Sequence, residues 1–420
     1  MNAILETAWQ QAGFETPTEI QSKTFDLLAD GQSVLGLAPT GTGKTLAFSL
    51  PILQNMQANA GLQLIILVSS QELAHQMQAA LQPFVKALGM SQVVVTGNTN
   101  VKRQMERLKA KPDLVIATVG RLMELLNKGK IKIKPLKAVI LDEADALLFE
   151  NGADKLQMVF DHLPKPLQVG FFGATTSRAV TDFATANHID FTTVDTRQKL
   201  VKTQKTEHLF LRANNNAKNV ILKELSRQKS FYGMVFFRQK NQLIKVAHIM
   251  ADWHVPVAIL DGRKDSIQRQ HALQSFRQHK INLLLATDVA ARGLDIDNLT
   301  TVVNYDIPET ETAYIHRSGR TGRMYKQGQV LTLGNDHDQR DLQKLLGTEV
   351  ALKLVYLVDG QLTQERPSHR EFKTTTGQSS RQAPGSGHSS RRTSEALKQS
   401  KKKQASRVKN RKNKGKPKRG

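Results

Sequence analysis

Eight consecutive residues near the N-terminus have the types and spacing of a phosphate-binding loop: Ala38, Pro39, Thr40, Gly41, Thr42, Gly43, Lys44 and Thr45. Apolar runs at residues 33–37 and 46–50 flank them, an order that predicts a strand, a glycine loop and a helix. Such a loop turns backbone N–H groups toward one point beside a helix N-terminus, where an anion binds. Lys44 would contact the outer phosphates and the Thr45 hydroxyl would ligate Mg²⁺. The sequence therefore predicts a nucleoside triphosphate site, although the usual pattern has glycine in place of Ala38.

An acidic cluster follows a second strand pattern further along the chain. Residues 137–141 form a mostly apolar run, and Asp142, Glu143 and Asp145 come directly after it. Because ligands of open α/β sheets bind at the carboxyl ends of the strands, Asp142 would reach the Mg²⁺ ion, largely through water. Glu143 would orient and deprotonate an attacking water. Alone, such a run is more often a solvated acidic turn, but behind a strand and with a phosphate-binding loop it predicts hydrolysis.

Three arginines, Arg317, Arg320 and Arg323, are spaced three residues apart after a short helical pattern. This spacing would be unusual for a solvated face and suits guanidinium groups that meet a polyphosphate. An arginine supplied across a cleft stabilises the charge that develops in phosphoryl transfer and contributes on the order of 10³–10⁵ in rate. A basic patch for phosphate backbones alone is the alternative.

These patterns resemble the DEAD-box family of ATP-dependent RNA helicases, and the resemblance covers nearly all of residues 1–345. Further segments that carry it are residues 13–21, 118–121, 173–175, 287–295 and 314–323. In the first of these, the resemblance implies that Phe14 stacks on adenine and that Gln21 binds its edge. An amide matches the donor and acceptor of adenine, so ATP would be preferred over GTP.

The resemblance also implies a role for each matching residue. Residues implied in catalysis are Lys44, Asp142, Glu143, His316, Arg320 and Arg323. Nucleotide contacts are implied for Phe14, Gln21, residues 38–45 and, at the ribose, Asp295. RNA contacts are implied for Thr118, Gly120, Arg121, Arg269 and Thr287. Coupling is implied for Asp145, Thr175 and Arg317, with His316 and Arg317 linking the other arginines to the acidic cluster and the attacking water.

Strand and helix patterns alternate in two halves that a polar stretch at residues 196–205 connects. This alternation predicts an α/β fold with parallel sheets covered by helices. By resemblance, residues 24–195 and 206–365 form two tandem RecA-like domains with ATP in the cleft between them, and residues 1–23 form a Q-motif segment. Strands are expected at residues 64–68, 93–96, 114–117, 138–141, 169–172, 234–237, 257–260, 283–286, 301–304 and 330–333.

Most of the excess positive charge lies in a C-terminal tail. Residues 366–420 contain 18 Lys and Arg against 2 Asp and Glu, and so carry +16 of the net charge of +23. The tail is rich in polar residues and has one aromatic residue, so we expect it to be disordered. Behind an ATPase of this type it predicts a sequence-independent RNA tether, with a solubility tail as the alternative.

Composition excludes several other classes. The chain has no cysteine, so disulfides, thiolate zinc sites and cysteine catalysis are ruled out. Residues 1–30 hold acidic residues and no sustained apolar core, so no signal peptide is expected. Apolar runs have strand length, which is too short for a membrane span. We expect a monomer in the cytoplasm.

The chain departs from the family pattern at several RNA-facing positions. Gln71 stands where the P-T-R-E-L-A segment has an RNA-binding arginine, and Asn98 replaces one of two paired glycines. Gly173 removes the hydroxyl of the S-A-T triad and leaves Thr175 to bond Asp145. Ser266 stands three residues before Arg269, where the family pattern has glutamine. We hypothesise that ATP hydrolysis is retained, whereas strand separation is modest and depends on the tail.

The expected function is that of an ATP-dependent RNA helicase that melts or remodels structured RNA locally. An ATP-gated RNA clamp or scaffold with little unwinding is the second hypothesis, and a DNA helicase of a neighbouring superfamily is the third. Short bacterial family members with basic tails work in ribosome assembly, RNA decay or cold adaptation. By that analogy alone, ribosomal precursors or RNA-decay machinery would be partners.

Overall fold

The first part of the chain forms a parallel sheet of seven strands in the order β3-β4-β2-β5-β6-β1-β7. Its strands are β1 (Val34–Leu37), β2 (Leu64–Val68), β3 (Gln92–Val95), β4 (Leu114–Thr118), β5 (Ala138–Asp142), β6 (Gln168–Gly173) and β7 (Thr192–Asp195). The computed structural model describes residues 1–97, 100–149, 152–197, 206–260, 266–291, 296, 299–322, 327–347 and 350–366. All five residues of β2 are buried, because a central parallel strand has helices on both faces.

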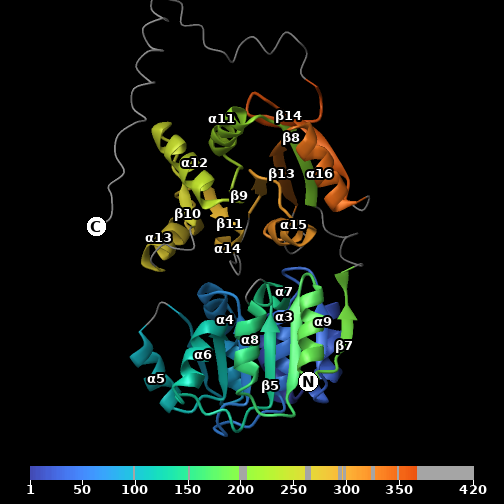
Figure 1. Cartoon of the computed structure of the whole chain (residues 1–420), viewed down its shortest axis with the longest axis vertical. Helices are drawn as coiled ribbons and strands as arrows, with labels where there is room; N and C mark the ends of the chain where they lie inside the picture. Colours follow the sequence, from blue (N-terminus) through green and yellow to red (C-terminus); the bar gives the residue numbers. More distant parts are fainter. Residues whose placement is uncertain are drawn as a thin grey trace, which may run out of the picture. The chain divides into compact units, whose positions relative to one another are not determined.

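Helices cover both faces of this first sheet (Figure 1). They are α1 (Ala3–Gln11), α2 (Glu19–Ala29), α3 (Lys44–Leu53), α4 (Gln71–Ala87), α5 (Val101–Lys109), α6 (Val119–Asn127), α7 (Ala144–Leu147), α8 (Gly152–Phe160) and α9 (Arg178–Ala186). Leu64 and Ile66 of β2 pack with α1–α4, whereas Ile65 and Leu67 pack with α5–α9. The period of two along the strand therefore divides its side chains between two cores.

The second sheet has eight strands in the order β10-β11-β9-β12-β13-β8-β14-β15. They are β8 (Thr206–Arg212), β9 (Gly233–Phe237), β10 (Ala258–Leu260), β11 (Leu283–Thr287), β12 (Thr301–Asn304), β13 (Gly328–Gly334), β14 (Leu352–Val358) and β15 (Gln361–Thr363). Its helices are α11 (Asn215–Arg227), α12 (Lys240–Asp252), α13 (Ser266–Arg277), α14 (Asp288–Ala291), α15 (Glu311–Ser318) and α16 (Asp336–Leu346). Helices α11 and α12 pack on one face and α13–α16 on the other. The pairing of β15 with β14 is antiparallel, and the other strands pair in parallel.

The predicted α/β fold with two parallel sheets is confirmed, and every predicted strand has an observed counterpart. The strands β7, β8, β14 and β15 were not predicted. Three of the four residues of β7 are exposed, and only one residue of β14 is buried, so the apolar pattern of these strands is weak. Residues 198–205 of the predicted linker and residues 367–420 of the predicted tail lie outside the described residues.

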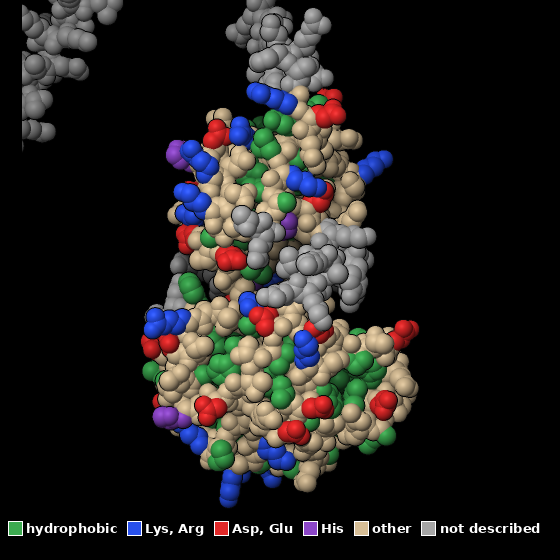
Figure 2. Space-filling model, turned by 90° about the vertical axis from the view of Figure 1, so that its right-hand side faces the viewer, with side chains coloured by type: hydrophobic (Ala, Val, Ile, Leu, Met, Phe, Trp, Pro, Cys, Tyr) green, Lys and Arg blue, Asp and Glu red, His purple; other side chains and the backbone are tan. Residues whose placement is uncertain are grey.

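Charges of both signs are distributed over the surface of the described residues. Figure 2 shows basic and acidic side chains interspersed over the face it presents. Residues 1–365 hold 42 Lys and Arg against 35 Asp and Glu, which agrees with this mixture. In the part of the chain that the structure describes, no helix combines the length and the apolar character that crossing a membrane requires.

A partly buried histidine joins the second sheet to helix α15. A hydrogen bond of 2.7 Å connects Nδ1 of His208, in β8, to the Tyr314 hydroxyl. Burial lowers the pKa of His208 to about 4, because a charged imidazole would lose its hydration there. Burial also raises the pKa of Tyr314. Both side chains are therefore neutral at physiological pH.

The neutral state of His208 predicts a pH-dependent loss of stability. Between pH 6.5 and 4 the unfolded chain binds a proton at this histidine and the folded chain does not, so the free energy of unfolding falls as the pH falls. The loss reaches at most about 3 kcal/mol. The variant His208→Gln keeps an acceptor for Tyr314 without titrating. Urea unfolding at pH 7 and pH 5 should show a smaller pH dependence for it than for the unchanged chain. His248→Gln, at an exposed histidine of α12, is the control; an equal pH dependence in all three proteins would contradict the prediction.

Candidate nucleotide and RNA site

Three neighbouring strands bring the predicted nucleotide residues to one edge of the first sheet. The strand order places β5, β6 and β1 side by side. The phosphate-binding loop follows β1, the acidic cluster follows β5, and residues 173–175 end β6. The Ala38 N–H donates to the Gly173 carbonyl at 3.0 Å, which ties the loop to the end of β6. The parallel arrangement therefore assembles residues that are far apart in the sequence.

The phosphate-binding loop has the backbone shape that its glycines predict. Gly41 and Gly43 have φ angles of 78° and 84°, in the left-handed region that favours glycine. A Cβ atom on Gly43 would lie 2.4 Å from the Gln21 amide nitrogen, so a larger residue would collide there. The Lys44 ammonium donates to the carbonyls of Ala38 and Pro39 at 2.8 and 2.9 Å. The lysine thus lies folded over the loop that would hold the phosphates.

The Q-motif segment contacts the phosphate-binding loop directly. The Gln21 side chain accepts from the Thr18 N–H at 2.8 Å and donates to the Gly43 carbonyl at 3.2 Å. A side-chain amide has two N–H groups and two lone pairs, so each end retains capacity for an adenine edge. Phe14 is 40% exposed and packs against Trp9 with ring centroids 4.7 Å apart. Its ring therefore has a free surface, as the expected stacking on adenine requires.

The acidic cluster turns sharply at the end of β5. Asp142 is buried and its Oδ1 accepts from the Glu143 N–H at 3.1 Å. Glu143 has φ and ψ of 53°, a left-handed conformation that is uncommon outside glycine, and it begins helix α7. Its Oε2 accepts a hydrogen bond from the Ser69 hydroxyl at 3.0 Å. Asp145 is buried and accepts from the Thr175 hydroxyl.

Burial shifts two charges of this site toward neutrality. Desolvation, followed by the charge of Glu143, raises the pKa of Asp142 to about 7. Desolvation lowers the pKa of Lys44 to about 8, although the charges of Asp142 and Glu143 oppose that shift. A bound polyanion and its cation would favour the charged form of each group. The oxygens of Thr45, in the first turn of α3, and of Asp142 are the ligands that Mg²⁺ prefers.

Helix α15 of the second domain and the residue that ends it contact this site. The Thr40 hydroxyl donates to the Gly319 carbonyl at 2.9 Å, which joins the phosphate-binding loop to the end of α15. His316 Nε2 lies 3.6 Å from Asp145 Oδ2 and 3.3 Å from the Thr175 hydroxyl. The structure therefore brings His316 to Asp145 and Thr175, the two residues of the first domain that are expected to couple the domains.

Arg320 is buried beside the proposed base. Its Nη2 lies 3.8 Å from Glu143 Oε1, and its side chain is 7% exposed. Desolvation lowers the pKa of Arg320, and the charge of Glu143 opposes this. A buried guanidinium near the phosphate-binding loop fits the arginine expected at the γ-phosphate.

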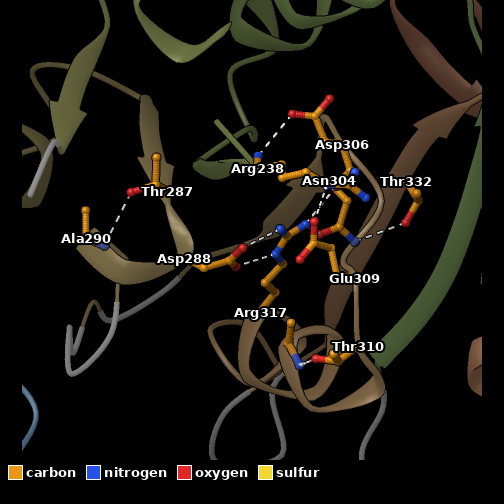
Figure 3. Close-up of polar contacts among 11 residues, drawn as sticks. Arg238, Thr287, Asp288, Ala290, Asn304, Asp306, Glu309, Thr310, Arg317 and Thr332 are labelled. Atoms are coloured by element: carbon orange, nitrogen blue, oxygen red, sulfur yellow. Dashed lines mark hydrogen bonds and ion pairs between the residues drawn. The ribbon is translucent and has the colours of Figure 1, made fainter. Parts of the chain in front are cut away.

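Arg317 lies differently from the expectation. Its guanidinium makes a two-pronged ion pair with Asp288, at 2.6 Å for each pair of atoms, and donates to Asn304 at 3.0 Å (Figure 3). It also donates to the Asp306 carbonyl at 2.8 Å. These partners all belong to the second domain, so Arg317 anchors α15 there and does not reach the acidic cluster.

Three of the expected RNA-binding residues, Arg269, Arg121 and Thr287, contact other residues of the protein. Arg269 of α13 has its Nε 2.7 Å from Glu72 Oε1 of α4, an ion pair without hydrogen-bond geometry, and its Nη2 donates to the Ala290 carbonyl. Arg121 is buried, with its Nε 3.1 Å from Glu124. Thr118 ends β4, Gly120 lies in α6, and Thr287 ends β11 and accepts from the Ala290 N–H at 3.4 Å. Arg269 is thus the candidate that joins the two domains.

The structure does not describe three of the residues that the sequence singles out. Asp295, Arg323 and Asn98 fall outside the described residues.

Two contacts were not predicted from the sequence, those of Ser69 with Glu143 and of Asp288 with Arg317. A serine in place of the family's proline was the signal for the first. The position of Asp288 directly after a strand was the signal for the second.

The fold and the site define a P-loop nucleoside triphosphatase with two RecA-like domains. A family model described as DEAD/DEAH box helicase matches residues 18–183, and one described as helicase conserved C-terminal domain matches residues 216–325. A probable ATP-dependent RNA helicase of Bacillus subtilis, YfmL, is 33% identical over 83% of this chain and 94% of its own. The DEAD-box ATP-dependent RNA helicase CshC of Bacillus cereus is 32% identical over 81% of this chain and 88% of its own. Dbp5 of S. cerevisiae bound to RNA and ADP BeF3 superimposes with a TM-score of 0.77 and 26% identity, over 84% of this chain and 94% of that one.

The chain therefore belongs to the DEAD-box family of ATP-dependent RNA helicases. As a member of it, this protein is an RNA-stimulated ATPase.

The glycine at position 173 leaves one atom of the acidic cluster without a donor. Asp145 Oδ1 is buried, and no donor among the described residues bonds it. A Cβ atom on Gly173 would lie 3.3 Å from this oxygen and 2.7 Å from the Thr175 carbonyl oxygen. The family's serine would carry its hydroxyl here, so the missing donor follows from the substitution.

This geometry predicts different costs for two substitutions at Gly173. Gly173→Ala crowds the Thr175 carbonyl and should lower the free energy of unfolding by about 1–3 kcal/mol. Gly173→Ser crowds it equally but offers a hydroxyl to Asp145, and should be about 1 kcal/mol more stable than the alanine variant. Urea unfolding of both variants measures the difference. At Gly97, where a Cβ atom meets nothing within 4 Å, the same pair is the control and should differ little. A serine variant of Gly173 no more stable than the alanine variant would refute the argument.

Proposed function

We propose that the protein couples ATP binding and hydrolysis to local melting or remodelling of structured RNA. The approach of Arg320 to within 3.8 Å of Glu143 carries this proposal, because it brings an arginine of one domain to the expected base of the other. The contact of His316 with Asp145 and the bond from Thr40 to Gly319 support it. ATP bound between the two domains would favour their closure, because it would contact both.

The proposed chemistry uses residues at the edge of the first sheet. Lys44 and the backbone of the phosphate-binding loop would bind the outer phosphates, and Phe14 and Gln21 would bind adenine. Glu143 would accept a proton from the attacking water, and Arg320 would stabilise charge on the transferred phosphoryl group. Thr45 and Asp142 would hold Mg²⁺, which neutralises phosphate charge when it is bound.

RNA binding is proposed along the carboxyl ends of both sheets. Thr118, Gly120 and Arg121 would contact the sugar–phosphate backbone from the first domain, and Arg269 and Thr287 from the second. A strand held by its backbone and bent would no longer fit a regular duplex, so its partner would be released. By linkage, RNA must tighten ATP binding as much as ATP tightens RNA binding. Because Gln71 is uncharged and Arg121 is buried, an RNA clamp with little unwinding remains the second candidate.

The finer assignments of the sequence analysis remain predictions. They comprise the domain bounds 24–195 and 206–365 with the Q-motif segment 1–23, the linker 196–205, the tail 366–420, the roles of Asp295 and Arg323, a monomeric state and a cytoplasmic location. Ribosomal precursors and RNA-decay machinery remain partners by analogy alone.

Replacement of Arg320 should test the role that carries the proposal. Arg320→Ala should lower kcat for ATP hydrolysis by about 10³-fold, the lower end of what such an arginine contributes. Arg227→Ala, at an exposed ion pair with Glu224 in α11, is the control and should leave kcat unchanged, because exposed pairs contribute little. Hydrolysis is measured at saturating ATP and single-stranded RNA. A kcat for Arg320→Ala within a few-fold of the control would exclude the proposed role.

The basic tail should determine how RNA binding depends on salt. If about six of its charges engage phosphates, RNA affinity should fall roughly a thousandfold between 50 and 200 mM salt. A version ending at Glu365 should bind RNA more weakly, with a shallower salt dependence, and its ATP hydrolysis should be less strongly stimulated by RNA. Equal affinity, unwinding and stimulation in both versions would rule out the tether. Release of a short duplex, measured beside RNA retention, separates the helicase from the clamp.

A further inference from the structure

We propose that Ser69 is a positioning residue for ATP hydrolysis, because its hydroxyl holds the Glu143 carboxylate in the orientation that meets the attacking water. This inference rests on the proposed function, in which Glu143 accepts the proton of that water. It concerns a position where the family has proline, which has no hydroxyl to donate. Members that carry this proline therefore lack the contact.

The contact joins two segments that are far apart in the sequence. The Ser69 hydroxyl donates to Glu143 Oε2 at 3.0 Å. Ser69 directly follows β2, which lies beside β5 in the sheet, so its side chain is carried by a rigid neighbouring strand. The next residue, Ser70, has a separate task, because its hydroxyl accepts from the Leu73 N–H and caps helix α4. The Ser70 hydroxyl therefore caps a helix, whereas the Ser69 hydroxyl bonds Glu143.

Few other contacts restrain the Glu143 side chain among the residues that the structure describes. Its second oxygen, Oε1, lies 3.8 Å from Arg320, which is beyond hydrogen-bond distance. The side chain is only 16% exposed and begins from a left-handed backbone conformation. A hydrogen bond to an ionised acceptor is stronger than one between neutral groups. The Ser69 hydroxyl is therefore the short contact that fixes the carboxylate plane.

The carboxylate can still accept a proton from water. An ionised carboxylate has about four acceptor sites, and Ser69 uses one of them. Orientation matters because a general base works only within hydrogen-bond reach of the proton it removes. Loss of the hydroxyl should therefore lower kcat.

The test begins with three variants of the full chain, assayed at saturating ATP with and without poly(U) RNA. Ser69→Ala should lower kcat about tenfold, a part of the 10²–10⁴ that general base catalysis supplies, and leave KM for ATP within about twofold. Ser69→Thr keeps the hydroxyl and should restore kcat. Ser91→Ala is the matched control, because Ser91 donates to the Asp113 carboxylate at the same distance of 3.0 Å. It should leave kcat unchanged.

A double-mutant cycle with Glu143 assigns the effect to the proposed partner. Glu143→Gln alone should abolish most hydrolysis, and adding Ser69→Ala to it should change kcat no further, because residues that act as a unit are not additive. A kcat unchanged by Ser69→Ala, beside an inactive Glu143→Gln, would overturn this inference and leave the proposed function standing. An active Glu143→Gln would overturn the proposed function. A change in KM, no recovery with threonine, or an additive loss in the double variant would show a merely structural role for Ser69.

Discussion

Three carboxylates within four residues, at the end of the buried strand β5, are the constraint on which the site depends. Asp142 and Asp145 are buried and Glu143 lies between them in the chain, so their charges repel in a poorly hydrated place. Burying such groups costs free energy unless donors and cations face them. The partners come from both domains: Lys44 of α3, Ser69 after β2, Thr175 after β6, His316 of α15 and Arg320 after it. The acidic cluster thus determines which elements must meet.

The second domain positions the residues that contact the acidic cluster by anchoring one short helix, α15. Arg317 is 2% exposed, and its guanidinium is bonded by Asp288, which follows β11, and by Asn304, which ends β12; these two strands flank β9 in the sheet. A buried charge with several partners is restricted to one geometry. His316 precedes this anchor and Arg320 follows it, so both project from a fixed base. Two arginines of the repeat therefore have different contacts: Arg317 anchors α15, and Arg320 approaches the acidic cluster.

Much of the fold could be predicted, because central strands of parallel sheets are continuous apolar runs, as in β2 and β5. The strands β7 and β14 escaped prediction, because exposed or half-buried residues interrupt their apolar pattern. At the site, the order of strand, loop and helix located Lys44 and Asp142. The partner of Arg317 could not be predicted, since several carboxylates lie within range in sequence terms and only the register of β11 and β12 with β9 brings Asp288 beside it.

Two departures from the family pattern bear on the acidic cluster more than on RNA. Ser69, where the family has proline, adds a hydroxyl donor to Glu143. Gly173, where the family has serine, removes one from Asp145 and leaves its Oδ1 without a donor among the described residues. Relative to the family pattern, Glu143 has therefore gained a hydrogen-bond donor and Asp145 has lost one. Because His316 also contacts Asp145, a less restrained Asp145 would weaken the link to the second domain under the proposed roles, whereas a better-held Glu143 would support hydrolysis within the first. Under the proposed mechanism, restraint would thus have shifted from the coupling carboxylate to the catalytic one, which would favour hydrolysis over its coupling to strand separation.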